Sequence, residues 1–246
     1  MMQIRDRSFT WGHRTYLMGI LNVTPDSFSD EGEFNTLETA IGQAQQMLAA
    51  GVDSIDIGGQ STRPGAIEVS PATERDRVIP IIQKLREISS IPISIDTNRA
   101  EVAQAAIEAG ADLVNDVSGG THDRKMLPVV AQLGVPIILM HMRGTPQTMQ
   151  TLTDYDDLMG ELRQWLQQQV QAAIDAGISP DRIILDPGIG FAKTHDQNLE
   201  ILRQLPQLRS LGYPLLVGVS RKSFIGRILD RNDPKERIWG TAAACT

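Results

Sequence analysis

Seven short apolar segments recur along the chain, and each one ends at or just before a polar residue. They are Tyr16–Val23, Ser54–Gly59, Pro92–Thr97, Leu113–Ser118, Pro136–Met142, Arg182–Asp186 and Pro214–Ser220. Nearly continuous apolar character is typical of strands covered on both faces, as in parallel sheets. We therefore predict seven parallel strands. Their polar end residues are Asn22, Asp56, Asp96, Asn115, His141, Asp186 and Lys222.

Helix-like stretches separate these strands. They cover Thr36–Ala50, Pro71–Ile88, Arg99–Ala109, 123–133, 155–176, 196–210, Lys222–Leu229 and Pro234–Cys245, and residues 3–15 indicate an N-terminal hairpin. Regular alternation of strand and helix predicts an α/β fold with a parallel sheet. An open doubly wound sheet is one solution. The even repeat and the barrel-like length favour the other, a TIM (β/α)8-type barrel with seven βα units evident in this chain.

Composition narrows the class of protein. The chain has 246 residues, 41% hydrophobic content and a formal net charge of −7. No apolar run approaches the roughly 18 residues that a membrane span needs, and the acidic balance disfavours non-specific nucleic-acid binding. The N-terminal residues lack a secretory core, and Cys245 is the only cysteine. We expect one domain over 1–246 in the cytoplasm, without membrane or nucleic-acid partners.

The chemistry is expected at the carboxyl ends of the strands, where parallel βα proteins place their active sites. The loops 22–32 and 56–66, which follow the first two strands, are long and rich in polar and turn-forming residues. Loops of this kind usually bind ligands. Taken singly, Asn22 and Asp56 could merely satisfy backbone groups; the whole set of polar strand ends favours a binding site. Nucleotide-binding Gly-x-Gly-x-x-Gly and Walker-type loops are missing from the sequence.

Motifs at the strand ends resemble those of the pterin-binding family, and specifically of bacterial dihydropteroate synthases. They are Gly19-Ile-Leu-Asn-Val-Thr-Pro-Asp-Ser-Phe-Ser-Asp30, Asp56-Ile-Gly-Gly-Gln-Ser-Thr-Arg-Pro-Gly-Ala66, Ile95-Asp-Thr97, Val114-Asn-Asp-Val-Ser-Gly119, Met140-His-Met142, Asp186-Pro-Gly-Ile-Gly-Phe191 and Ser220-Arg-Lys-Ser223. The first two motifs are specific, whereas Asp-Pro-Gly-Ile-Gly-Phe alone is weak. Ala192 stands where the family commonly has glycine.

The resemblance implies a transferase of folate biosynthesis. Its substrates would be 6-hydroxymethyl-7,8-dihydropterin diphosphate and p-aminobenzoate, and its products 7,8-dihydropteroate and diphosphate. Two alternatives stay open: an inactive pterin-binding fragment, and a pterin-dependent methyltransferase of the same superfamily. The two specific loop motifs favour the synthase.

The resemblance also assigns residues to the two substrates. Asp96, Asp186 and Lys222 would be catalytic, and Asn115 would join them in holding the pterin, because an amide both donates and accepts hydrogen bonds. Further substrate contacts would come from Thr62, Arg63, Ser223, Phe191 and Met140. Taken alone, Phe191 and Met140 favour core packing instead. Phe28 and Pro64 would shape the pocket wall, and His141 and Asp56 would be supporting residues.

A departing diphosphate builds negative charge, so a metal or fixed cations are expected near it. The resemblance implies Mg²⁺, with Asn22 as its protein ligand. It also implies a possible homodimer formed through the last helices. The family continues into an eighth strand with an Arg-x-His pair for the diphosphate, so we expect this barrel to be C-terminally incomplete.

Overall fold

A six-stranded parallel sheet forms the centre of the computed structural model, which describes residues 1–24, 33–63 and 65–246. Its strands follow one another in chain order: β3 (Met18–Asn22), β4 (Ser54–Gly58), β5 (Ile93–Asp96), β6 (Leu113–Asp116), β7 (Ile137–Met140) and β8 (Ile183–Asp186). Each strand therefore pairs with the one before it. Phe28 and Pro64, which the sequence places in the pocket wall, lie outside the described residues.

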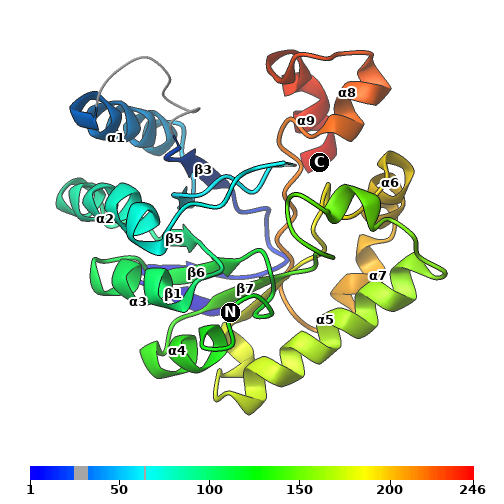
Figure 1. Ribbon diagram of the computed structural model, residues 1–246, viewed down its shortest axis with the longest axis horizontal. Helices are drawn as coiled ribbons and strands as arrows, with labels where there is room; N and C mark the ends of the chain where they lie inside the picture. Colours follow the sequence, from blue (N-terminus) through cyan, green and yellow to red (C-terminus); the bar gives the residue numbers. More distant parts are fainter. Residues whose placement is uncertain (25–32, 64) are drawn as a thin grey trace.

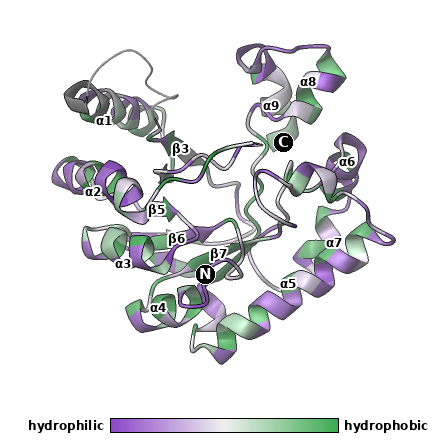
Figure 2. Ribbon diagram, viewed as in Figure 1, coloured by the Kyte–Doolittle hydropathy of each residue, from purple (hydrophilic) through white to green (hydrophobic). Residues whose placement is uncertain are grey.

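The helices follow one another along the outer side of the sheet, in the same sequential order as the strands (Figure 1). They are α1 (Glu33–Ala49), α2 (Pro71–Ile88), α3 (Ala100–Glu108), α4 (Met126–Leu133), α5 (Leu158–Asp175), α6 (His195–Arg203), α7 (Leu205–Arg209), α8 (Ser223–Leu229) and α9 (Ile238–Cys245), with 3-10 turns η2 (Met149–Thr151), η3 (Pro180–Arg182) and η4 (Pro234–Arg237). Figure 2 shows hydrophobic and hydrophilic residues side by side on most of these helices, as expected for elements that cover a core.

Helix α2 illustrates why these segments are helical. Ser70 is its N-cap and accepts a hydrogen bond from Thr73 N, and Pro71 occupies the first turn, where a missing N–H costs nothing. Its buried face includes Val78, Ile82 and Leu85, which recur at helical spacing. Burial of this face against the sheet fixes the helix beside β4.

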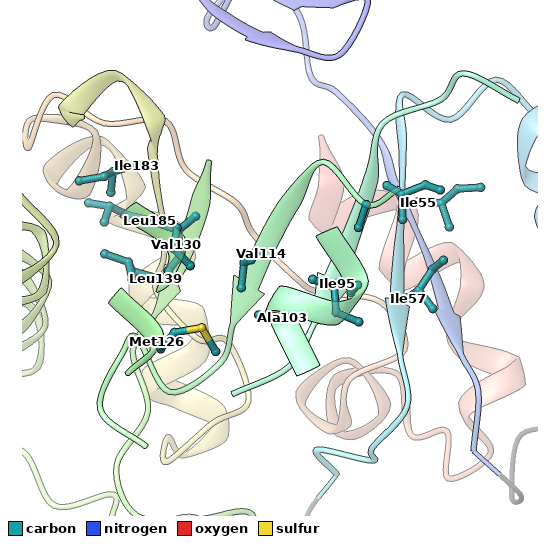
Figure 3. Close-up of a cluster of buried hydrophobic side chains, with 14 of the residues drawn as sticks. Ile55, Ile57, Ile95, Ala103, Val114, Met126, Val130, Leu139, Ile183 and Leu185 are labelled. Atoms are coloured by element: carbon teal, nitrogen blue, oxygen red, sulfur yellow. The ribbon is translucent and has the colours of Figure 1, made fainter. Parts of the chain in front are cut away.

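The two faces of the sheet have different partners. Residues such as Val114, Leu139 and Leu185 point toward the helices and form the main core with Met126 and Val130 (Figure 3). The intervening residues Leu113, Ile138 and Ile184 point the other way and pack on the N-terminal hairpin. This hairpin consists of β1 (Met2–Ile4) and β2 (Arg7–Phe9), paired antiparallel, and contributes Met2, Ile4 and Phe9 to that second cluster.

This arrangement confirms the α/β fold and favours the barrel over the doubly wound sheet. A doubly wound sheet reverses its strand order and carries helices on both faces. Here the strand order follows the chain, and the helices gather on one face (Figure 1). Within the described residues β3 pairs only with β4, so the TIM-type sheet is curved but not closed.

Two predicted elements differ from the structure. Pro214–Ser220 lies along β8 but makes only an isolated bridge, from Leu185 to Leu215, because Pro214 has no N–H and two hydrogen bonds alone join the segments. The helix predicted over 196–210 is two helices, α6 and α7, separated at Gln204. Pro206 explains the break, since a proline inside a helix removes one hydrogen bond and clashes with the preceding turn.

The described part of the chain bears on two earlier expectations, the missing membrane span and the single cysteine. None of its helices combines the length and the hydropathy that crossing a membrane requires. The single cysteine, Cys245, is exposed and free.

Candidate active site

One face of the sheet, the face turned away from the helices, carries five of the polar strand ends: Asn22, Asp56, Asp96, Asn115 and Asp186. One row of paired residues crosses β3 to β6 and consists of Asn22, Gly58, Asp96 and Asn115. Paired residues in a sheet point to the same side, and so do residues two apart along a strand. Asp56, two residues before Gly58, therefore points to this face as well.

Met140 and Asp186 extend the same face at the other side of the sheet. They pair with each other at the ends of β7 and β8. They lie two residues beyond Ile138 and Ile184, whose side chains pack on the N-terminal hairpin. The face is thus apolar near the hairpin and polar at the carboxyl ends of the strands, where the sequence predicts the site.

Gly58 leaves room between two predicted site residues. A Cβ at this position would lie 3.4 Å from Asn22 Oδ1 and 3.4 Å from Asp96 Oδ2. The amide of Asn22 and the carboxylate of Asp96 therefore both border Gly58, and a side chain at this position would contact both.

Asp56 and Asn115 form a buried pair. Asn115 Nδ2 donates to Asp56 Oδ2 at 3.0 Å, and this bond fixes the orientation of the amide. Burial raises the pKa of the Asp56 carboxyl, and the hydrogen bond from Asn115 opposes the rise. Asn115 Oδ1 is buried and has no hydrogen-bond partner in the described part of the chain. An acceptor left open in this way is suited to a ligand that donates a hydrogen bond.

Asp96 stands among other carboxylates. Burial raises its pKa well above the usual range, and the charges of Asp56, Glu74 and other carboxylates add to the rise. Glu74 is itself paired with Arg99, at 2.6 Å. A set of buried acceptors without enough cations attracts a ligand that is rich in N–H donors or carries positive charge.

Asp186 is held by the turn that follows β8. Gly188 N donates to Asp186 Oδ1 at 2.7 Å, with Gly188 at a φ of 69°. Burial raises the pKa of the Asp186 carboxyl, while Lys222, Gly188 N and Lys193 oppose the rise. This carboxylate therefore has cationic neighbours that Asp96 lacks.

Lys222 immediately precedes α8 and points back toward this turn. Its Nζ donates to Ile189 O and lies 4.9 Å from the centre of the Phe191 ring. Burial lowers its pKa to about 8, against the attraction of Asp186. The structure thus brings together three predicted residues, Asp186, Lys222 and Phe191.

Sequence reasoning missed a second lysine at this edge, and this one is buried. Lys193 is 3% exposed, and its Nζ lies 3.0 Å from His141 Nδ1 and 2.9 Å from Phe191 O. Burial lowers the pKa of Lys193 to about 7 and that of His141 to about 2. His141 also packs edge-on against Trp165, in keeping with its predicted supporting role.

The remaining predicted residues lie at the margin of the polar face. Thr62 and Asp96 line the same small cavity, together with Gln60, Glu74, Thr97, Asn98 and Val117. Arg63 is exposed. Ser223 is also exposed and is the first residue of α8, with Lys222 rather than Ser223 as the N-cap. The structure shows no contact of Arg63 or Ser223 with the buried carboxylates.

The residues around Asn22 offer few ligands to the implied magnesium ion. The described residues contain no cluster of three or more His, Cys, Asp or Glu side chains that could cage a metal. Asn22, at the partly exposed end of β3, offers one amide oxygen beside Asp96. Mg²⁺ usually keeps several waters and takes further oxygens from a phosphorylated substrate, so a single side-chain ligand fits it.

Comparisons with known proteins agree with this geometry. The curated dihydropteroate synthase of Synechocystis sp. is 65% identical over 237 residues, covering 96% of this chain and 82% of the relative. The structure of the Clostridium difficile dihydropteroate synthase in the presence of pteroic acid superposes with a TM-score of 0.91 at 46% identity, covering 96% of this chain and 88% of that one. The Xanthomonas albilineans dihydropteroate synthase with 4-aminobenzoic acid gives 0.89 at 43% identity, with coverages of 94% and 82%.

The family model described as pterin binding enzyme matches residues 18–246, from the first strand of the sheet to the last described residue. The matched span includes all seven polar strand ends. The chain belongs to the family of pterin-binding enzymes.

Proposed function

We propose that the protein is a dihydropteroate synthase of folate biosynthesis. It joins 6-hydroxymethyl-7,8-dihydropterin diphosphate to p-aminobenzoate and releases diphosphate. The observation that carries the proposal is the set of Asp96, Asn115 and Asp186 on one face of the sheet, with Lys222 beside Asp186. The similarity to dihydropteroate synthases, one of them solved with pteroic acid and another with 4-aminobenzoic acid, supports it.

The pterin ring would lie against the end of β8. Its pyrimidine edge carries adjacent N–H groups, and the Asp186 carboxylate would accept hydrogen bonds from two of them. Asn115 Oδ1, which is buried without a described partner, would accept another. Lys222 would donate to a ring carbonyl or nitrogen, because its Nζ already points toward this turn. Phe191 and Met140 would cover the ring.

The reaction then needs a leaving group and a nucleophile. The C–O bond at the pterin methylene breaks, and the electron pair leaves with the diphosphate. The positive charge left on the methylene, conjugated into the ring, is stabilised by the carboxylates of Asp96 and Asp186. The neutral amine of p-aminobenzoate attacks this carbon, forms the new C–N bond and loses one proton to solvent.

Asn22 would hold Mg²⁺ beside the diphosphate. When bound, the ion neutralises charge on the departing oxygens. Asn22 ends β3, and Thr62 and Arg63 belong to the loop after β4. That loop contacts the loop after β7, because Gly65 N donates to Pro146 O and Gln147 Nε2 donates to Ala66 O. We assign Thr62 and Arg63 to the diphosphate and p-aminobenzoate, and Ser223, in the first turn of α8, to the carboxylate of p-aminobenzoate.

A pyrophosphate-release assay tests this function. The wild-type protein should release pyrophosphate only when both substrates and Mg²⁺ are present, and chelation of Mg²⁺ should stop turnover while pterin binding persists. Release of pyrophosphate without p-aminobenzoate would overturn the synthase. Pterin binding without any turnover would indicate an inactive pterin-binding protein, and methyl transfer from methyltetrahydrofolate to a corrinoid would indicate a methyltransferase.

The variant Asp186→Ala tests the pterin assignment. Loss of two charge-assisted hydrogen bonds should weaken pterin binding about 100-fold or more. The exposed Asp181, on η3, gives the matched control Asp181→Ala, which should bind like the wild type. Wild-type pterin affinity in Asp186→Ala would remove the central residue of the proposal.

We also propose that the protein acts in the cytoplasm as a homodimer. Exposed apolar residues on the last two helices support a subunit contact there, with Ile228 58%, Ile238 54% and Trp239 84% exposed. Sedimentation velocity of the wild type and of Trp239→Ser tests this. A monomeric wild-type protein at micromolar concentration would contradict the dimer.

A further inference from the structure

Four side chains hold the loop between β8 and α6, and three of them come from elsewhere in the fold. Four consecutive carbonyl oxygens in this loop each accept one side-chain hydrogen bond. Lys222 Nζ donates to Ile189 O, and Gln150 Nε2 donates to Gly190 O. Lys193 Nζ donates to Phe191 O, and Tyr155 OH donates to Ala192 O. Irregular backbone that is buried needs such partners. Because the same loop carries Phe191 and the Gly188 N–H that binds Asp186, its shape determines the shape of the pterin site.

The backbone of this loop requires restraint. Gly188 and Gly190 have φ values of 69° and 84°, and Ala192, which carries a side chain, has a φ of 50°. An L-residue in this left-handed region costs about 1–2 kcal/mol, so the surrounding contacts must hold it there. Lys193 and Tyr155 donate to the carbonyls of Phe191 and Ala192, in the two peptide groups that flank the Ala192 Cα.

Whereas Lys222 is partly exposed, Lys193 is the buried lysine of this set. Its second partner is His141 Nδ1, at 3.0 Å. Burial and the neighbouring cations keep the pKa of His141 near 2, so the ring is neutral near pH 7 and its Nδ1 accepts the proton of the ammonium group. Lys193 therefore ties the loop after β8 to the end of β7 through two hydrogen bonds.

Lys193 also acts on Asp186 electrostatically. The charged groups that face Lys193 are Asp186 on β8, Lys222 before α8 and Arg143 after β7, beside the neutral His141. Its positive charge lowers the pKa of Asp186, in the same direction as that of Lys222. The charge is present on the acidic side of neutrality, where a buried carboxyl is prone to take up a proton.

We propose that Lys193 is a positioning residue for pterin binding, which fixes the loop of Phe191 and keeps Asp186 ionised to accept the pterin N–H groups. This inference rests on the proposed function. Nothing in the chemistry requires Lys193 to touch the substrate. Its two roles, hydrogen bonding and charge, can be separated by substitution.

Three variants of Lys193 separate these roles. Lys193→Met keeps the length of the side chain and removes both hydrogen bonds and the charge. Lys193→Gln keeps a donor but no charge, and Lys193→Arg keeps the charge. Lys125→Met, at an exposed lysine before α4, is the matched control for loss of one positive charge. The ligand is 6-hydroxymethyl-7,8-dihydropterin diphosphate, measured by calorimetry from pH 5 to 9, with KM for p-aminobenzoate measured in parallel.

The expected result is a loss of pterin affinity that depends on pH. Near pH 7, Lys193→Met should bind about 10- to 100-fold more weakly, as for loss of a buried hydrogen bond to a charged group. Pterin affinity should fall at low pH as Asp186 becomes protonated, and we call this part of the pH profile the acidic limb. The midpoint of the acidic limb should move up by about 1 pH unit in both Lys193→Met and Lys193→Gln. Lys193→Arg should restore the wild-type limb, and KM for p-aminobenzoate should not change.

Two outcomes overturn the inference while leaving the proposed function intact. One is a wild-type acidic limb in folded Lys193→Met or Lys193→Gln. The other is equal weakening of p-aminobenzoate and pterin, which indicates general loosening. If Lys193→Met does not fold by circular dichroism, Lys193→Gln decides, because it keeps donors for both partners. A wild-type protein that releases no pyrophosphate with both substrates would instead refute the proposed function.

Discussion

Gly188 illustrates how closely single residues are constrained at this site. A Cβ at this position would overlap His141 O far inside van der Waals contact, and its φ of 69° disfavours any side chain. Its N–H is a hydrogen-bond donor to Asp186. Backbone strain and steric overlap therefore coincide at a residue whose N–H holds Asp186.

We expect Gly188→Ala to weaken pterin binding by more than about 10-fold and to destabilise the fold by about 2 kcal/mol or more, since strain and overlap add. Gly212→Ala is the control, because Gly212 has a φ of 85° but open space around its Cβ position. It should lose stability from strain alone and bind pterin normally. Calorimetric titration and urea unfolding measure the two effects. Equal behaviour of the two variants would contradict the predicted overlap.

At this scale the sequence identifies the residues that follow a pattern. Asp96, Asn115 and Asp186 end apolar strands, so the topology alone brings them to one edge of the sheet. Lys193 follows no strand, and a loop lysine is ordinarily assumed to be exposed. One signal was available: Lys193 precedes the Thr194–Gln197 capping box, a position that commonly carries a residue packed on the helix.

Helix α6, which follows this lysine, begins with a capping box. Thr194 Oγ1 accepts from Gln197 N at 3.2 Å, and Gln197 Oε1 accepts from Thr194 N at 2.8 Å. The same Gln197 side chain also donates to Thr153 O. The start of α6 is thereby fixed directly after the loop that carries Phe191 and Lys193.

We expect Thr194→Ala to lower the free energy of unfolding by about 1 kcal/mol, the usual cost of a lost N-cap. Thr194→Ser, which keeps the hydroxyl, should stay near the wild type. Urea denaturation of both variants measures the difference. If Thr194→Ala were as stable as Thr194→Ser, the capping box would not contribute to stability.

Elements are predictable where local pattern and tertiary contact agree. Helix α2 begins and ends at the predicted residues, because its Ser70 cap and its apolar stripe both coincide with packing on the sheet. Pro214–Ser220 has the same apolar pattern as the other strands. It makes only a bridge to β8, since ladder formation depends on partners that the pattern of one segment cannot specify.

At the scale of the whole molecule, buried ionisable groups make stability depend on pH. Burial lowers the pKa of Lys193 to about 7 and that of Lys222 to about 8, from 10.5. Between these values and 10.5 the unfolded chain binds protons that the folded chain has released. These lysines therefore contribute stability above about pH 10, and it is lost as the pH falls through 8 and 7.

We expect the free energy of unfolding of the ligand-free protein to rise between pH 7.5 and 9.5, by about 1 kcal/mol per pH unit for each lysine. Lys193→Met should show a shallower rise, and Lys125→Met the wild-type rise. Guanidinium unfolding across this range measures the slope. A flat profile in the wild type would mean that neither lysine titrates below its usual pKa when the protein is folded.

Four aspartates with raised pKa values act at the acidic end. Burial raises the pKa values of Asp56, Asp96, Asp116 and Asp186. Their contribution is therefore present at low pH and is lost as the pH rises through those raised values. The sequence identifies these carboxylates. Their pKa values depend on burial and on the carboxylates and lysines that the folded chain brings near them.

The order of strands in the sheet, identical to their order in the chain, has a consequence for synthesis on the ribosome. Each new strand adds beside the one made just before it, so the sheet can grow from its N-terminal side as translation proceeds. The ligand site is completed later than the sheet. Asp56 and Asp96 are present once β4 and β5 are made, whereas Lys193 and Lys222, the cations beside Asp186, emerge last. The nascent sheet therefore lacks both lysines until the final quarter of the described chain is added.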